Sequence, residues 1–158
     1  MTREKLLEYV RFMAEGEKPI NRVYQYILKH GRYFKGAFEH TILPRGRLNV
    51  SIIRPKKKWC YYNAQMLTLM YPASRIVEYY EGVGNCGLMI GGHAWNVYEG
   101  KVVDITWEDI PKEFPEAAKP LSEFEYFGVP IPFEFVRKHN PIKTRLVQPL
   151  LPKYLGYE

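Results

Sequence analysis

The chain has 158 residues, of which 46% are hydrophobic and 25% are charged. This composition is ordinary for a folded protein and excludes global disorder, and the length suits a single domain over residues 1–158 with a sizeable core. The net charge of +6 favours anionic partners such as nucleic acid or an acidic polymer, but it does not define a function.

The two cysteines are too few for a disulfide framework and are typical of a reducing compartment. A structural bond between Cys60 and Cys86 stays open as an alternative. No apolar run reaches the roughly 20 residues that a membrane span needs. The first residues lead into an amphipathic pattern rather than an apolar signal core, so we expect a cytoplasmic protein with no membrane partner.

Two amphipathic helices are predicted near the N-terminus, over residues 3–15 and from about residue 21 to residue 30, because apolar residues recur there at helical spacing. A glycine follows each of them, as is common after a helix. Residues 31–55 are rich in glycine and proline, and we expect irregular structure there with a short strand at 49–53. This segment leads directly to Cys60 and is expected to form one wall of a substrate groove.

A buried central helix is predicted to begin near Cys60 and to end near Tyr71, because Pro72 disfavours helical geometry in the residue before it. Cys60 therefore falls in the first turn of this helix. Unpaired N–H groups and the positive end of the helix dipole favour a thiolate there, and three lysines precede it. The thiolate is the nucleophilic form of cysteine.

Three or four antiparallel strands are predicted after the central helix. Residues 75–80 are expected to form a strand, 82–85 a bend and 86–90 another strand. Residues 91–107 are expected to form a β-hairpin that turns at Glu99-Gly100, because both arms are rich in β-branched and aromatic residues.

The register of this hairpin brings two functional side chains together. With a two-residue turn, Tyr98 pairs with Lys101 and Asn96 with Val103, and Trp95 then faces Asp104. His93 and Asp104 become diagonal neighbours on one face, with Cβ atoms about 7 Å apart, so the carboxylate can reach the imidazole. A histidine oriented by a carboxylate is part of many nucleophilic sites, for which Cys60 is the candidate nucleophile.

The C-terminal third is expected to have little regular structure. An acidic, proline-interrupted stretch follows Trp107 and predicts a surface loop or a short helix. Residues 126–132 predict an extended run, residues 133–138 a short helix, and residues 141–158 a tail with a few apolar anchors.

The chain resembles the transglutaminase-like branch of the papain-like cysteine protease superfamily over residues 55–110. The resemblance comes from a cysteine that begins a buried helix, then His-Ala-Trp on one strand, then Val-Val-Asp-x-Thr-Trp on the next. It implies an α+β fold in which N-terminal helices and the helix of Cys60 pack on an antiparallel sheet. It also implies Cys60 as nucleophile, His93 as general base and Asp104 as the acid that orients it. Lys58 and Trp59 stand where true transglutaminases have Gly-Gln.

Other side chains are predicted to assist this site. The Cys60 backbone N–H is the expected donor to an oxyanion, with Trp59, Asn63 or Gln65 as possible helpers. Asn63 and Gln65 are also interpretable as capping or surface groups, which is the more ordinary role. Trp95 shares the face of His93 and is expected to shield the His–Asp pair from water or simply to pack in the sheet.

Two rival sites have weaker support in the sequence. Cys86 is closer to His93 along the chain but lies in a glycine-rich extended region without a helix dipole. A zinc site built from Cys60, Cys86, His93 and Asp104 lacks any C-x-x-C or H-x-x-x-H pair. The sequence therefore implies neither a metal nor an organic cofactor.

The predicted function is thiol-dependent acyl transfer from a peptide or another amide-containing substrate, through a thioester on Cys60. Hydrolysis and transfer to an amine both stay open, as does an amidase of the bacterial wall-hydrolase type. The alternative is a non-catalytic binding protein of the same fold. In that case Lys56, Lys57 and Lys58, followed by Trp59 and two tyrosines, contact nucleic acid or another anionic polymer.

Overall fold

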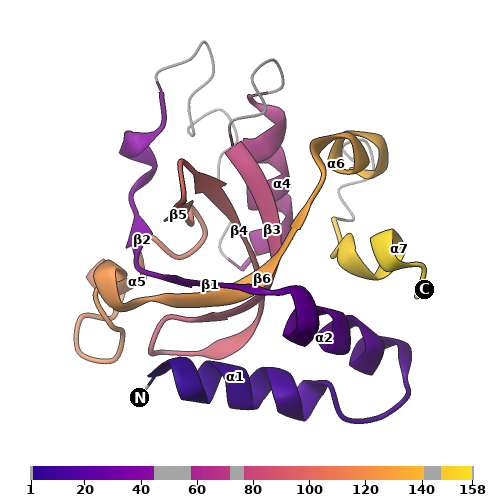
Figure 1. Cartoon of the computed structure of the whole chain (residues 1–158). Helices are drawn as coiled ribbons and strands as arrows, with labels where there is room; N and C mark the ends of the chain where they lie inside the picture. The colour runs from indigo at the N-terminus through magenta and orange to yellow at the C-terminus, as the bar shows by residue number, and fades with distance from the viewer. Residues whose placement is uncertain (1, 45–57, 72–76, 141–146, 158) are drawn as a thin grey trace.

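The computed structural model describes residues 2–44, 58–71, 77–140 and 147–157. They form a mixed α+β fold in which one curled sheet of six strands is surrounded by helices (Figure 1). The helices are α1 (Thr2–Met13), α2 (Pro19–His30), α4 (Cys60–Leu69), α5 (Ile110–Glu113), α6 (Phe133–His139) and α7 (Leu151–Leu155), with short 3₁₀ turns η1 (His40–Ile42) and η2 (Leu121–Glu123). The strands are β1 (Arg32–Lys35), β2 (Ala37–Phe38), β3 (Val77–Asn85), β4 (Ile90–Tyr98), β5 (Lys101–Val103) and β6 (Glu125–Ile131).

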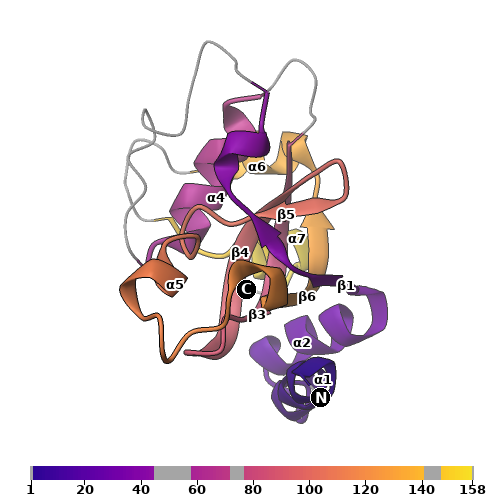
Figure 2. The ribbon, with the colours of Figure 1, turned by 90° about the vertical axis from the view of Figure 1, so that its left-hand side faces the viewer.

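The two predicted N-terminal helices are confirmed, with slightly different ends. In α1, Leu6 and Val10 are fully buried, and in α2 the apolar stripe buries Val23 and Ile27. Pro19 is the first residue of α2. A backbone N–H at this position would have no acceptor within the helix, so proline costs no helical hydrogen bond there. The two helices contact each other and β6, and both views place them at the lower end of the sheet, below α4 (Figure 1, Figure 2).

The strands follow the order β1-β6-β3-β4-β5-β2. All neighbouring pairs are antiparallel except β2 and β5, so the expectation of a purely antiparallel sheet is wrong at one edge. Residues 31–55 were expected to be irregular, yet β1, β2 and η1 lie within 32–42. The strand expected at 49–53 lies outside the described residues.

The strand boundaries before His93 also differ from the prediction. Residues 82–85, expected as a bend, continue β3 because they pair with β4 on one side and β6 on the other. Residues 86–89, expected to start a strand, form the connection between β3 and β4, and β4 begins at Ile90.

The β4–β5 hairpin has the predicted register. Asn96 pairs with Val103, Val97 with Val102 and Tyr98 with Lys101. Glu99 and Gly100 have φ angles of 51° and 78°, which are the left-handed conformations that a two-residue turn of this twist requires. Asp104 directly follows Val103 at the end of this ladder, which brings it close to His93 on β4.

Helix α4 is fixed to β4 by a buried polar contact. The Asn96 side chain points toward α4, and its Nδ2 donates to the Ala64 carbonyl at 2.8 Å and to Thr68 Oγ1 at 3.0 Å. Side chains on the same face of the sheet pack with α1, α2 and α6 in one apolar cluster that includes Cys60. The other face, inside the curl, packs a second cluster around Trp95, Trp107 and Tyr126.

The C-terminal third has more regular structure than the sequence indicates. The acidic stretch after Trp107 contains the short helix α5, and the extended run is the strand β6 in the middle of the sheet. The predicted short helix is confirmed as α6, and the tail adds α7.

Candidate active site

Cys60 is the first residue of α4, as the sequence predicts. Its thiol is free and its side chain is nearly buried, at 8% exposure. The first helical bond of α4 runs from the Asn63 N–H to the Trp59 carbonyl, so the N–H groups of Cys60 and the next two residues have no acceptor within the helix. These N–H groups give the sulfur a local positive field.

His93 and Asp104 form a buried pair. The distance between His93 Nε2 and Asp104 Oδ2 is 2.7 Å, and the two side chains are 2% and 1% exposed. Asp104 accepts further hydrogen bonds from the Tyr126 hydroxyl at 2.8 Å and from the backbone N–H groups of Thr106 and Trp107 at 3.2 Å each. The carboxylate is therefore held from four directions, which fixes the orientation of the imidazole.

The ring that covers His93 is Trp107. The centroids of the two rings lie 3.6 Å apart at an interplanar angle of 13°, whereas Trp95 stacks at 6.3 Å. Trp95 was expected either to shield the pair or to pack in the sheet, and Trp107 is the ring closer to His93. The absence of a side chain at Gly84 permits this stack, because a Cβ there would lie 2.7 Å from the Trp107 ring and 3.3 Å from His93 Cδ2.

Several groups set the protonation of His93. Burial by itself lowers its pKa, but the Asp104 carboxylate, its hydrogen bond and a hydrogen bond with Cys60 together raise the pKa of His93 from 6.5 to about 9. The imidazole is therefore charged at neutral pH. Because Asp104 occupies Nε2, the ring nitrogen left for the Cys60 sulfur is Nδ1. The structure thus brings Cys60, His93 and Asp104 together.

Of the residues predicted to assist the oxyanion, Asn63 and Gln65 are buried, whereas Trp59 is exposed. Asn63 is fully buried, and its Nδ2 donates to Thr106 Oγ1 at 3.0 Å, so it ties α4 to the loop after β5. Gln65 is also fully buried, and the expectation that it and Asn63 are capping or surface groups is wrong for both. Trp59 is 42% exposed and packs edge-on against Tyr62.

Trp95 lies inside the curl of the sheet. Its side chain is fully buried, and within the described residues its indole N–H has no hydrogen-bond partner. It stacks on Tyr80 with ring centroids 5.9 Å apart. It is thus part of the aromatic packing behind His93.

The rival candidates are separated from this arrangement. Cys86 is a free, fully buried thiol in the cluster around Trp95 and Trp107, so the alternative bond between Cys60 and Cys86 is not formed. Among the described residues, no three His, Cys, Asp or Glu side chains are grouped so that they could hold a metal ion. Lys58 is exposed just before α4, while Lys56 and Lys57 lie outside the described residues.

Two residues around His93 were missed by the sequence analysis. Trp107 belongs to the Val-Val-Asp-x-Thr-Trp motif, so the sequence contained a signal that this residue lies near His93. We assigned the shielding of His93 to Trp95 instead. Tyr126 lies on β6, which is not a neighbour of β4 in the sheet, and no local pattern places its hydroxyl on Asp104. Only the sheet order brings it there.

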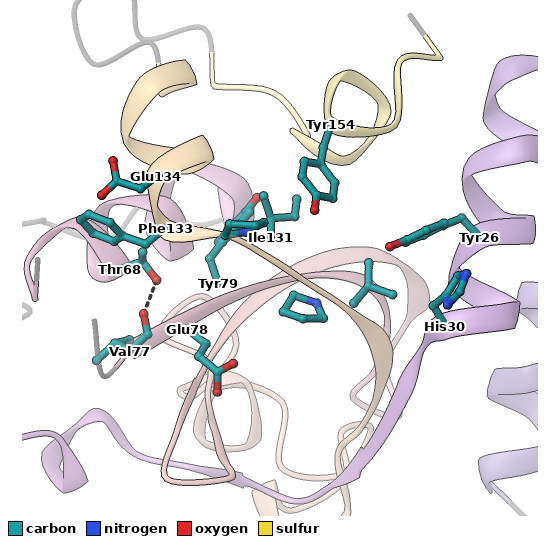
Figure 3. A pocket seen from close by; sticks show the side chains of 13 residues that line it. Tyr26, His30, Thr68, Val77, Glu78, Tyr79, Ile131, Phe133, Glu134 and Tyr154 are labelled. Carbon is teal, nitrogen blue, oxygen red and sulfur yellow. Dashed lines mark hydrogen bonds between the residues drawn. The ribbon is translucent and has the colours of Figure 1, made fainter. Parts of the chain in front are cut away.

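A pocket of about 560 Å³ lies elsewhere in the molecule (Figure 3). Its walls come from α2, β3, β6, α6 and α7, and Figure 3 shows the hydroxyl groups of Tyr26 and Tyr154 pointing toward the same space. Thr68 also lines it. Thr68 follows Cys60 by eight positions on α4, so the two residues are about 12 Å apart along the helix axis. The pocket contains none of the three candidate catalytic side chains.

No helix within the described ranges is both long enough and apolar enough to cross a membrane. Comparison of the chain with protein-family models, with curated proteins and with solved structures finds no match.

Proposed function

We propose that this chain is a thiol-dependent acyl-transfer enzyme of the transglutaminase-like, papain-like type, which hydrolyses a peptide or isopeptide amide bond through a thioester on Cys60. The observation that carries the proposal is the buried 2.7 Å contact between His93 and Asp104 together with the interaction of the same imidazole with Cys60. A nucleophile, a base and an orienting acid in this chain of contacts are the components of nucleophilic catalysis.

The raised pKa of His93 supports this assignment. A pKa of about 9 keeps the imidazole protonated at neutral pH, and a cation beside the sulfur stabilises the thiolate. The positive end of the α4 dipole, at which Cys60 lies, acts in the same direction. In the reactive form of this proposal, the Cys60 sulfur lies beside an imidazolium that Asp104 holds.

The reaction then proceeds in two halves. The Cys60 thiolate adds to the amide carbonyl carbon, and the carbonyl π electrons move to oxygen. The tetrahedral intermediate collapses, the C–N bond breaks, and the leaving amine takes the proton from His93. In the second half, His93 removes a proton from water, the hydroxide adds to the thioester, and the thiolate leaves as the acid product forms. Asp104 keeps the imidazole oriented through both halves.

Acyl-enzyme formation tests this proposal. p-Nitrophenyl acetate should add one acetyl group to the protein, located on Cys60 by mass spectrometry, with release of p-nitrophenolate. Cys60→Ala should abolish the adduct, and Cys86→Ala, the matched control at the buried cysteine, should leave it unchanged. Acetylation that persists in Cys60→Ala would contradict the assignment.

Exposed Lys58 and Trp59 at the start of α4 favour a second candidate function, the binding of an anionic polymer. A cation next to a partly exposed aromatic ring is suited to single-stranded nucleic acid. Affinity for an oligonucleotide that falls steeply with salt and is unaffected by Cys60→Ala would favour this function. Lack of binding at low salt would exclude it.

A further inference from the structure

Three tyrosine side chains from three different helices meet beside Cys60. They are Tyr9 of α1, Tyr24 of α2 and Tyr61 of α4, and they belong to the same apolar cluster as Cys60. The rings of Tyr9 and Tyr24 pack edge to face with centroids 6.3 Å apart. The acyl-transfer mechanism above does not use these hydroxyl groups.

The hydroxyl groups gather over the first residues of β4. A Cβ built on Gly92 would lie 3.3 Å from the Tyr24 hydroxyl and 3.5 Å from the Tyr61 hydroxyl, and one built on Gly91 would lie 3.8 Å from that of Tyr9. Gly92 immediately precedes His93 in the chain and is exposed. The missing side chain thus lets the hydroxyls of Tyr24 and Tyr61 lie close to the backbone of the strand that carries His93.

The Tyr24 and Tyr61 phenols remain neutral donors at physiological pH. Burial and then the neighbouring Cys60 raise the pKa of Tyr61 far above its ordinary value, and burial together with Tyr9 raises that of Tyr24. The effect of Cys60 on Tyr61 means that the phenol and the sulfur are close enough to interact. Within the described residues, the Tyr61 hydroxyl makes no hydrogen bond to a protein group, whereas Tyr24 and Tyr9 interact through their hydroxyls.

We propose that Tyr61 is a further catalytic residue, whose hydroxyl donates a hydrogen bond to the substrate carbonyl oxygen as the Cys60 thiolate adds to the carbonyl carbon. This inference rests on the proposed function. Together with the backbone N–H of Cys60, Tyr61 supplies the donors to the oxyanion, in place of the expected Trp59 and Asn63, whose side chains contact Tyr62 and Thr106. Tyr24 and Tyr9 are positioning residues that hold the side chain of Tyr61 in place.

The substrate group at this position is an uncharged carbonyl. The Tyr24 and Tyr61 hydroxyls and the glycine backbone beside them offer uncharged hydrogen-bonding groups, and a neutral carbonyl oxygen matches the phenol donors. In the step, the thiolate lone pair forms the C–S bond and the carbonyl π pair moves to oxygen, where it is stabilised by the phenol O–H. The phenol proton stays on Tyr61 throughout.

The experiment compares two reactions of the same thiol. Acylation by p-nitrophenyl acetate passes through an oxyanion, whereas alkylation by iodoacetamide occurs at an sp³ carbon and does not. Tyr61→Phe should slow acylation about 10²–10³-fold, the usual effect of removing one oxyanion donor, and should leave the alkylation rate unchanged. Tyr62→Phe, the adjacent tyrosine on another side of α4, is the matched control and should alter neither rate.

Each outcome has a defined meaning. Equal slowing of both reactions in Tyr61→Phe, or no change in either, overturns the role of Tyr61. If Tyr61→Phe does not fold, Tyr24→Phe on a different helix provides the test, and slower acylation at an unchanged alkylation rate supports the inference, while unchanged acylation overturns it. Failure of wild-type Cys60 to react with either probe at neutral pH overturns the proposed function itself, and this inference falls with it.

Discussion

At the scale of single residues, the central observation is that both carboxylate oxygens of Asp104 accept hydrogen bonds. Its two oxygens accept hydrogen bonds from His93, from Tyr126 and from two backbone N–H groups. Because a buried carboxylate is costly unless it is paired and hydrogen-bonded, each of these donors contributes to holding the charge that orients His93.

Tyr126→Phe tests this dependence. The substitution removes one buried hydrogen bond to a carboxylate and should destabilise the protein by about 1.5–3 kcal/mol, measured as a lower urea midpoint at an unchanged slope. Tyr154→Phe, at an exposed tyrosine, is the control and should stay within about 0.5 kcal/mol. Equal stability of Tyr126→Phe and the wild type would show that Asp104 does not depend on this donor.

At the scale of elements, a buried carboxylate on β3 anchors the C-terminal segment. Glu81 Oε2 accepts from the Leu150 N–H at 2.6 Å and from the Tyr79 hydroxyl at 2.5 Å, and Oε1 accepts from the Leu151 N–H at 3.0 Å. Gln65 of α4 extends this network by donating to Tyr79 and to the Gln148 carbonyl. The helix of Cys60 and the tail are therefore held by the same set of polar groups.

Glu81→Gln should loosen this anchor. An amide presents only one acceptor oxygen to the two backbone N–H groups, so amide exchange at Leu150 and Leu151 should become at least about tenfold faster, corresponding to roughly 1.4 kcal/mol. Glu134→Gln on α6, where the carboxylate is exposed and bonded to Arg137, is the matched control. Unchanged exchange at both leucines in Glu81→Gln would contradict the anchoring role.

The elements also show what a sequence can and cannot predict. The helices α1 and α2 and the register of the β4–β5 hairpin depend on local spacing and on a turn at Glu99-Gly100, and all three were predicted. Strands β1 and β2 were missed because they are short and pair with β6 and β5, which lie far along the chain. Glycines 82 and 84 suggested a bend, but pairing on both sides overrides their low strand propensity.

The candidate site divides in the same way. The proximity of His93 and Asp104 follows from a local hairpin, and the place of Cys60 from a helix start, so both were accessible from the sequence. The hydroxyls of Tyr126 and of the tyrosines near Gly92 come from elements brought together only by the sheet order and by helix packing. Their positions depend on long-range contacts that no local pattern records.

At the scale of the whole molecule, two buried groups make stability depend on pH. Burial raises the pKa of Glu81 from 4.5 to about 7, although three hydrogen bonds oppose the shift. The surroundings of His93 raise its pKa from 6.5 to about 9. In both cases the folded state binds the proton more tightly than the unfolded state, so the stabilising contribution is complete below the unfolded pKa and is lost as the pH rises through the folded pKa.

The free energy of unfolding should therefore fall as the pH rises. The contribution of Glu81 should be lost between pH 4.5 and about 7, and that of His93 between pH 6.5 and about 9. Urea titrations across this range should show that the free energy of unfolding depends less on pH between pH 6.5 and about 9 in His93→Gln. In Glu81→Gln it should depend less on pH between pH 4.5 and about 7. A wild-type protein whose stability rises between pH 7 and 9 would contradict the assigned shifts.

The most direct measurement is the rate of iodoacetamide labelling of each cysteine against pH, with the sites assigned by mass spectrometry. Cys60 should label well below the pH of about 8.5 at which an ordinary thiol ionises, and His93→Ala should abolish this early labelling. Buried Cys86 is the internal control and should label only after unfolding. If Cys60 also labels only in denaturant, or labels equally well without His93, the thiolate–imidazolium pair and the acyl-transfer function built on it are wrong.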